Sequence, residues 1–200
     1  MSLYAHAVRD LEGWAAPDGE QRTLRDLYLA HLQAHPDGLS RSCRAGHITA
    51  SAAVLDADGR HVVLTLHRKI GRWLQLGGHC EPDDVTLAAA ALREATEESG
   101  VAGLVLLPRP VNLDRHAVRC GNGATESTPG DGPAMEGPVA GRAGWTWHLD
   151  VQFAAIAPRG ASPVCGDESD AVRWWPVQWL PADVDDSVRR LVDRARAAVA

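Results

Sequence analysis

Three glutamates near the middle of the chain have the residue type and spacing for metal-ion chemistry. Glu94, Glu97 and Glu98 follow an alanine-rich segment and are predicted to lie on one helix. At about 100° per residue they fall within an arc of roughly 100°. Carboxylates this close repel one another, and Glu98 shares the azimuth of the apolar Leu87 and Ala91. A partly buried acidic stripe needs a cation, and oxygen ligands suit Mg²⁺ or Mn²⁺.

A solvated, acidic last turn of a helix is the alternative interpretation of this stripe. Negative charge is unfavourable at a helix C-terminus because it faces the negative end of the helix dipole. A Gly77-Gly78 turn also lies shortly before the helix. Both features favour the metal site.

The segment around these glutamates, residues 77–101, resembles the Nudix box, whose pattern is G-x5-E-x7-R-E-U-x-E-E-x-G-U with U an aliphatic residue. It reads GGHCEPDDVTLAAAALREATEESGV and covers about an eighth of the chain. Gly78 corresponds to the first Gly of the pattern, and Ala95 to the first aliphatic position. The other matching residues are Arg93, Glu94, Glu97, Glu98, Gly100 and Val101.

Two features depart from the box pattern. Gly78 and Arg93 are one residue further apart than the pattern allows, and Asp84 stands where the first Glu is expected. In the family that Glu helps to orient the ligand helix through the Arg. We expect Asp84 to pair with Arg93, with the extra residue absorbed before the helix.

The resemblance implies both a fold and an activity. The fold is an α/β, Nudix-like α/β/α sandwich with a mixed sheet. The activity is divalent-metal-dependent hydrolysis of the pyrophosphate bond in a nucleoside diphosphate linked to another moiety. The resemblance assigns the metal to Glu94, Glu97 and Glu98 with the Gly78 carbonyl, and the fixing of the carboxylates to Arg93. Catalysis would then be mostly positioning and charge neutralisation.

A general base often lies outside the box in this family. The candidate here is Glu168, in the polar GDESD turn before the Trp174-Trp175 strand. Glu126 and Glu136 are the other candidates. We expect one of these carboxylates to complete the catalytic residues Arg93, Glu97 and Glu98.

A second group of polar residues lies on two predicted strands. Alternation places His148 and Asp150 on one face of one strand, and Asp114 and His116 on one face of another. If these strands pair, the four side chains converge. The residues predicted to contact the substrate are His79, His116, His148 and Asp150. The same side chains could form an extra metal site, or be ordinary polar strand faces with each His paired to a carboxylate.

Hydrophobic periodicity predicts alternating helices and strands. In addition to the acidic helix, the expected helices are residues 3–14, 22–35 and 186–199. The expected strands are residues 47–55, 61–68, 73–76, 104–107, 111–118, 145–155 and 171–175, the first two forming a hairpin around Asp58-Gly59. Residues 1–45 are interpreted as an N-terminal helical extension packed on the domain, and residues 46–200 as the Nudix domain.

A Gly/Pro-rich segment near residues 120–144 interrupts this pattern. Its composition cannot make a core, which predicts a flexible insertion. Loops of this length are functional or mobile. The segment is either a lid over the active site or a passive insertion.

Composition and charge exclude several classes of protein. A net charge of −6 argues against a nucleic-acid polymer as partner, and no apolar run reaches membrane-spanning length. The charged residues Arg9, Asp10 and Glu12 argue against a signal peptide. The four cysteines lack metal-site spacing, which favours reduced thiols and a cytoplasmic location. A small nucleotide-type substrate fits these limits, and the N-terminal helices could form a homodimer contact.

Two other functions remain open at this point. One is a non-catalytic Nudix-like nucleotide-binding or sensor domain, for which the missing box Glu is the main argument. The other is a Nudix-fold isoprenyl diphosphate isomerase, which needs a Cys and Glu pair at set positions, whereas Cys80 lies inside the box. Family signatures for ADP-ribose and dinucleoside polyphosphate substrates are absent at residues 116–119, so no individual substrate is predicted.

Overall fold

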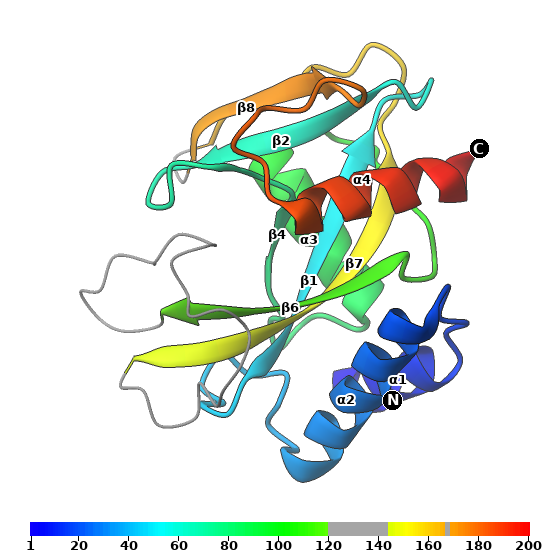
Figure 1. Cartoon of the computed structure of the whole chain (residues 1–200), viewed down its shortest axis with the longest axis vertical. Coiled ribbons are helices and arrows are strands. Elements are labelled where there is room, and N and C mark those ends of the chain that lie inside the picture. Colours follow the sequence, from blue (N-terminus) through cyan, green and yellow to red (C-terminus); the bar gives the residue numbers. More distant parts are fainter. Residues whose placement is uncertain (120–143, 167–168) are drawn as a thin grey trace.

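The computed structural model describes residues 1–119, 144–166 and 169–200. Within this part of the chain, four helices surround one mixed sheet of eight strands (Figure 1). The helices are α1 (Leu3–Glu12), α2 (Gly19–Ala34), α3 (Leu87–Ser99) and α4 (Asp186–Val199). The strands are β1 (His47–Leu55), β2 (His61–His67), β3 (Trp73–Leu74), β4 (Leu76–His79), β5 (Val105–Leu106), β6 (Asn112–Arg119), β7 (Trp145–Ile156) and β8 (Ser169–Pro176).

Strand β1 is the centre of the sheet. It runs antiparallel to β2 in the predicted hairpin, where Val54 faces Val63, and antiparallel to β4. It also runs parallel to β7, with His47 opposite His148. Strand β7 in turn pairs antiparallel with β5 and β6, and β8 pairs with β2. The predicted α/β fold with a mixed sheet and an N-terminal helical part is confirmed.

Two apolar layers form on opposite faces of β1. Its even-numbered residues, Ile48 to Val54, belong to the cluster that contains the buried face of α3. On the other face, Ala53 and Leu55 pack into the cluster of α4. In Figure 1, α3 lies behind the sheet and α4 in front of it. Because α4 covers only the end of β1 near Ala53, the opposite end of this face carries polar side chains.

Helices α1 and α2 both contribute residues to the first cluster, and α2 packs against β6 (Figure 1). Gln21 is buried, its amide donating to the Leu113 carbonyl at 3.0 Å and accepting from the Leu113 N–H at 2.7 Å. The Tyr28 hydroxyl donates to the Asp114 carbonyl at 2.6 Å. These bonds tie α2 to the strand that carries Asp114 and His116. The division of the chain at residue 45 stays a prediction.

Most of the predicted elements form within a few residues of their expected bounds. Helix α2 begins three residues earlier than expected because the Asp18 carboxylate accepts from the Gln21 N–H at 2.9 Å and caps the helix at Gly19. Helix α1 ends at Glu12, and Trp14 lies beyond it, with its indole N–H donating to the Pro110 carbonyl at 2.6 Å. Among the described residues, no helix has the length and apolar character needed to cross a membrane. The Gly/Pro-rich insertion lies outside the described residues, apart from Gly144.

The β1–β2 turn generates a pH-dependent prediction. One Asp56 oxygen accepts from the N–H groups of Arg60 and His61, at 2.7 and 3.1 Å, and the other lies 2.8 Å from His61 Nδ1. Burial raises the pKa of Asp56, but these hydrogen bonds outweigh it and lower the pKa overall. A carboxylate with a lowered folded-state pKa stabilises the fold above its unfolded-state pKa. This contribution is lost as the pH falls through the folded-state pKa.

We therefore expect Asp56→Asn to lower the free energy of unfolding by about 1 kcal/mol at pH 7. The difference from wild type should shrink as the pH falls below about 4. Urea unfolding of both proteins across this pH range measures it. Asp170→Asn, which alters an exposed ion pair with Arg68, is the control and should change little. A loss of stability independent of pH would contradict the assignment.

Candidate functional site

Helix α3 presents the acidic residues to the Gly77-Gly78 turn. The helix begins after Thr86, whose hydroxyl accepts from the Ala89 N–H at 3.0 Å, and ends at Gly100, which is left-handed with φ of 64°. Its apolar face, with Ala91 and Ala95 fully buried, packs on the sheet. The acidic residues next to this buried face therefore lie beside β4, which α3 also contacts.

The glycines of the turn allow close approach to both the sheet and the helix. The Gly77 N–H donates to a Glu98 carboxylate oxygen at 3.0 Å. A Cβ at Gly77 would lie 2.2 Å from the Ser51 Cβ, and a Cβ at Gly78 would lie 2.7 Å from the Glu94 carboxyl carbon. A side chain at Gly77 would overlap the backbone of β1, and a side chain at Gly78 would displace the Glu94 carboxylate of α3.

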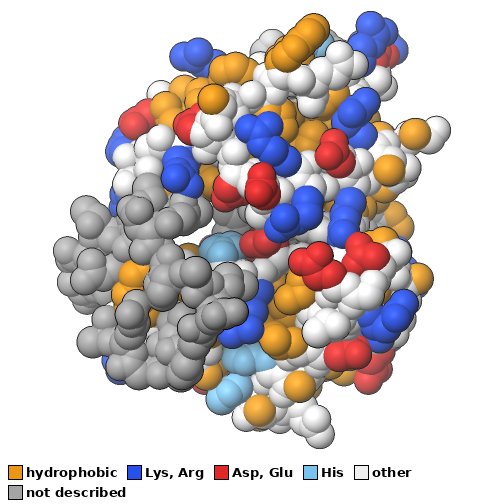
Figure 2. Space-filling model, viewed as in Figure 1, with side chains coloured by type: hydrophobic (Ala, Val, Ile, Leu, Met, Phe, Trp, Pro, Cys, Tyr) orange, Lys and Arg blue, Asp and Glu red, His pale blue; other side chains and the backbone are white. Residues whose placement is uncertain are grey.

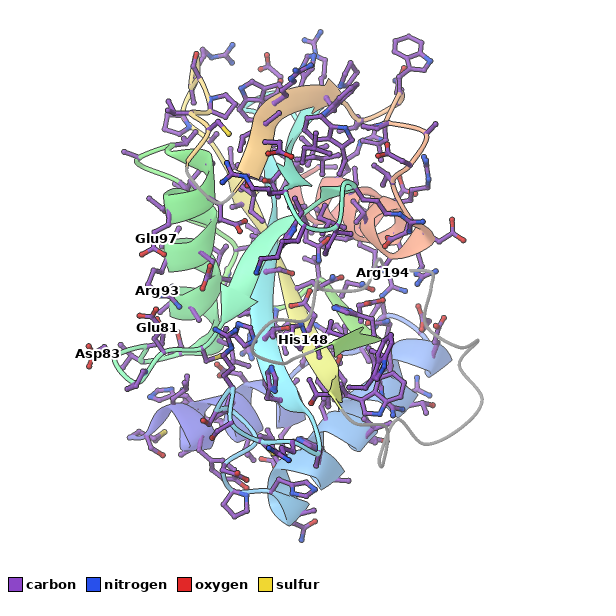
Figure 3. The ribbon with its side chains drawn as sticks, turned by 90° about the vertical axis from the view of Figure 1, so that its left-hand side faces the viewer. Glu81, Asp83, Arg93, Glu97, His148 and Arg194 are labelled. Atoms are coloured by element: carbon purple, nitrogen blue, oxygen red, sulfur yellow. The ribbon has the colours of Figure 1, made fainter. Side chains whose placement is uncertain are left out.

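Arg93 joins the turn, the loop before the helix and the acidic stripe. Its guanidinium binds both Asp84 oxygens, at 3.2 and 3.0 Å, and the His79 carbonyl at 3.0 Å. It also donates to Glu94 at 2.9 Å and Glu97 at 3.3 Å. Figure 3 shows Arg93 and Glu97 side by side on the outer side of α3. Hydrogen bonding to Asp84 raises the pKa of Arg93, so the cation is retained at all ordinary pH values.

The expected pair between Asp84 and Arg93 is thus confirmed. Asp84 is 9% exposed and also accepts from the Glu81 N–H at 2.7 Å. The additional residue of the box lies in the loop, since helical geometry begins only at Leu87. Asp84 therefore makes the contact with Arg93 that the family assigns to the first box Glu.

The three box glutamates differ in their exposure. Glu97 is the most exposed, with 61% of its side chain accessible, whereas the Glu94 side chain is 16% accessible. Glu98 is half-buried beside Gly77. Burial raises the pKa of Glu94, which the charge of Arg93 opposes only in part. The single positive charge of Arg93 therefore offsets only part of the negative charge of the three glutamates, of which Glu94 and Glu98 are partly buried. This arrangement favours a bound cation.

The predicted convergence of the two polar strands is also confirmed. Strands β6 and β7 pair so that Asp114 lies opposite Asp150 and His116 opposite His148. The His116 Nδ1–H donates a hydrogen bond of 2.9 Å to the Asp114 carboxylate. Burial opposes protonation of His116, but Asp114 outweighs it and raises the pKa of this imidazole. Figure 2 shows histidine atoms near the middle of this face of the molecule, beside acidic atoms.

Asp150 is the most extensively bonded carboxylate of this face. It is 3% exposed and accepts four hydrogen bonds from side chains. The donors are Thr49 at 3.0 Å, Ser51 at 2.6 Å, Gln75 at 3.2 Å and Gln152 at 2.9 Å. This bonding fixes the polar end of β1 against β7, so we expect Asp150 to order the wall of the site.

Three residues of this wall were not among the predicted site residues: His47, Thr49 and Ser51. They share one face of β1, and His47 lies 3.0 Å from His79 between their Nε2 atoms. The alternation of polar side chains in His47–Leu55 was a signal that could have identified them. A strand that is buried along its whole length, as β1 is, hides this signal among apolar neighbours.

The predicted general bases cannot be placed. Glu168, Glu126 and Glu136 lie outside the described residues.

The other predicted site residues fall into two groups that meet at β4: the acidic box on α3, and the histidine and aspartate face of β6 and β7. They meet there because the His79 carbonyl binds Arg93 while its ring faces His47.

Comparison with known proteins supports the sequence resemblance. The family model described as the NUDIX domain matches residues 46–195. None of the curated proteins compared matches the sequence significantly. The resemblance that rested on the box alone thus extends over most of the chain.

Two solved structures are similar to this fold. One is a hydrolase of the NUDIX family from Clostridium perfringens, with 19% identity and a TM-score of 0.54, covering 77% of this chain and 98% of that chain. The other is the E. coli dihydroneopterin triphosphate pyrophosphohydrolase, with 16% identity and a TM-score of 0.51, covering 76% and 95%. At this identity the likeness establishes the fold. Together with the family match, it shows that the chain belongs to the Nudix family.

Proposed function

We propose that this protein hydrolyses the pyrophosphate bond of a nucleoside diphosphate linked to another moiety, with Mg²⁺ or Mn²⁺ as cofactor. The observation that carries the proposal is the convergence of Glu94 and Glu98 on the Gly77-Gly78 turn, beside the guanidinium of Arg93. Membership of the Nudix family supports hydrolase chemistry in general. The nucleotide substrate and the choice of metal belong to the proposal.

The chemistry of the donor groups fits a hard divalent cation. The proposed ligands are the carboxylates of Glu94, Glu97 and Glu98 with the carbonyl oxygen of Gly78, all of them oxygen donors. The Glu94 carboxyl lies so close to Gly78 that no side chain fits between them. A cation there would offset the repulsion among carboxylates that Arg93 neutralises only in part.

The residues of the chain perform the positioning. Arg93, fixed by Asp84, binds Glu94 beside the turn and Glu97 on the outer side of α3. The Gly77 N–H holds Glu98 in the same way. A bound divalent cation would neutralise charge on the pyrophosphate and activate the attacking water. Catalysis then depends on carboxylates that are ordered before the substrate arrives.

The substrate is proposed to lie along the polar face next to the box. His79 connects the two groups, and His116, His148 and Asp150 line the adjoining strands. We keep Glu168 as the proposed general base on its sequence position alone. Formation of a homodimer and a cytoplasmic location stay predictions.

The alternative functions are less well supported by the site. The argument for a non-catalytic sensor was the missing box Glu, and Asp84 supplies the missing contact to Arg93. An isomerase would use an acid–base Cys. Burial raises the pKa of the Cys80 thiol to about 12, and its sulfur faces the Ile48 carbonyl at 3.8 Å. This cysteine is held as a neutral thiol within the fold.

We expect Glu97→Gln and Glu98→Gln each to lower the rate of hydrolysis at least roughly a hundredfold, because each removes a charge at the metal site. A phosphate-release screen over nucleoside diphosphate and triphosphate derivatives, with Mg²⁺ or with EDTA, measures this. Glu20→Gln, an exposed change on α2, is the matched control. Activity close to wild type in both box variants would refute the site. Tight binding of nucleotide without turnover in wild type would favour the sensor.

Alanine substitutions of the two glycines should have different effects. The Cβ of Gly78→Ala meets the Glu94 carboxyl, a side chain that can move, so activity and Mg²⁺-dependent stabilisation should fall while the fold remains. The Cβ of Gly77→Ala meets the backbone of β1, 2.6 Å from the Ser51 Cα, so the fold itself should be destabilised. Thermal melting in EDTA and with Mg²⁺ measures both. If Gly78→Ala keeps full activity, the placement of Glu94 at the metal is wrong.

A further inference from the structure

Three histidines from three neighbouring strands meet beside the acidic box. They are His47 of β1, His79 of β4 and His148 of β7, and one ring nitrogen of each lies within 4.8 Å of those of the other two. The ring centroids are separated by 4.8 to 5.1 Å. The pairing register of the strands brings the three rings together, because His47 is directly opposite His148 and Thr49 is opposite His79. The cluster is thus part of the sheet and does not depend on a loop.

The hydrogen bonding of these rings is incomplete. His148 Nε2 is inaccessible to solvent and has no hydrogen-bond partner among the described residues. A buried polar atom without a partner costs about 1–3 kcal/mol. His47, 1% exposed, directs its Nδ1 to the Cys43 carbonyl at 3.4 Å. A ring whose Nδ1 donates to a carbonyl presents a lone pair at Nε2, as in many metal-binding histidines.

Burial favours the neutral form of the His47 and His148 imidazoles and lowers the pKa of both. Neutral imidazole is the form that binds a metal ion. The same loss of charge makes the cluster a poor site for a phosphate group.

We propose that His47, His79 and His148 bind a transition-metal ion of borderline softness, for which Zn²⁺ is the best match. Imidazole nitrogen suits Zn²⁺ and its first-row neighbours, whereas Mg²⁺ takes oxygen ligands. Three protein ligands are the number found in zinc sites that leave one position free for another molecule. The cluster is separate from the glutamates of α3 in its ligands and in the metal it selects.

The His79 residue connects this site to the box. Its ring belongs to the cluster, while its carbonyl accepts from Arg93 at 3.0 Å. Binding of a metal ion to the ring would therefore fix the backbone that Arg93 also holds. The site lies on the polar face of β1 and β7, beside His116, whose ring centroid is 5.4 Å from that of His148.

Calorimetric titration of the untagged protein, first stripped of metal, tests the proposal. We expect one Zn²⁺ per chain to bind this cluster and Mg²⁺ to leave that binding unchanged. His79→Asn and His148→Asn should each weaken it by at least roughly a hundredfold, since each removes a ligand. Circular dichroism establishes that the variants are folded. Inorganic phosphate, as the competing probe, should not bind; phosphate binding lost in the same variants with Zn²⁺ binding retained would overturn the proposal.

Two control variants distinguish other zinc sites. Another possible group of ligands is formed by His35, Asp37 and Cys43, so His35→Asn should leave Zn²⁺ affinity unchanged. Glu97→Gln should also leave it unchanged, because the box glutamates are not its ligands. Loss of the tight site in either control would overturn the assignment. Hydrolytic activity is not part of this test, so failure of the proposed function would leave its result intact.

Cobalt provides a second readout that does not depend on the folding of any variant. Co²⁺ bound to wild-type protein by three imidazoles in a low-coordinate site should give visible absorption bands, and Zn²⁺ should remove them. A Co²⁺ spectrum typical of six oxygen ligands would place the ion at the acidic box and overturn the proposal.

Discussion

The ion pair between Arg93 and Asp84 is the interaction on which the rest of the site depends. Three glutamates lie close together on one helix, and Glu94 and Glu98 are partly withdrawn from water. Without a neighbouring positive charge they would destabilise the fold. Arg93 provides that charge, and Asp84 fixes its direction while the His79 carbonyl binds the same guanidinium. One side chain thus orients the carboxylates of α3 and secures the loop that leads to them.

A second constraint is the division of one strand face between apolar and polar residues. Near Ala53 and Leu55, β1 packs under α4 and contributes to the core. Near His47 and Ser51 the same face is polar, and the hydroxyls of Thr49 and Ser51 donate hydrogen bonds to Asp150. Because α4 ends the apolar layer partway along β1, a polar site can form without interrupting the sheet. The proposed zinc ligands and the proposed substrate wall both lie in this polar part.

Local sequence patterns predicted much of this structure. Contacts between strands that are far apart in the sequence could not be predicted from these patterns. The spacing of Glu94, Glu97 and Glu98 identified the helix, its acidic stripe and the need for a cation, because helical periodicity is a local property. The pairing of Asp84 with Arg93 followed from the box pattern. His47 was missed because its partners His79 and His148 come from strands 32 and 101 residues away in the chain. Nothing local in the sequence encodes the parallel register of β1 with β7.

Measurement of the coupling free energy between Arg93 and Asp84 tests most directly whether this ion pair organises the site. A double-mutant cycle of wild type, Arg93→Met, Asp84→Asn and the double variant, unfolded by urea in EDTA, measures it. Removal of Arg93 leaves the buried carboxylate of Asp84 without its counter-charge, so we expect a coupling free energy of about 1–3 kcal/mol. Effects of the two substitutions that add to within about 0.5 kcal/mol would contradict it.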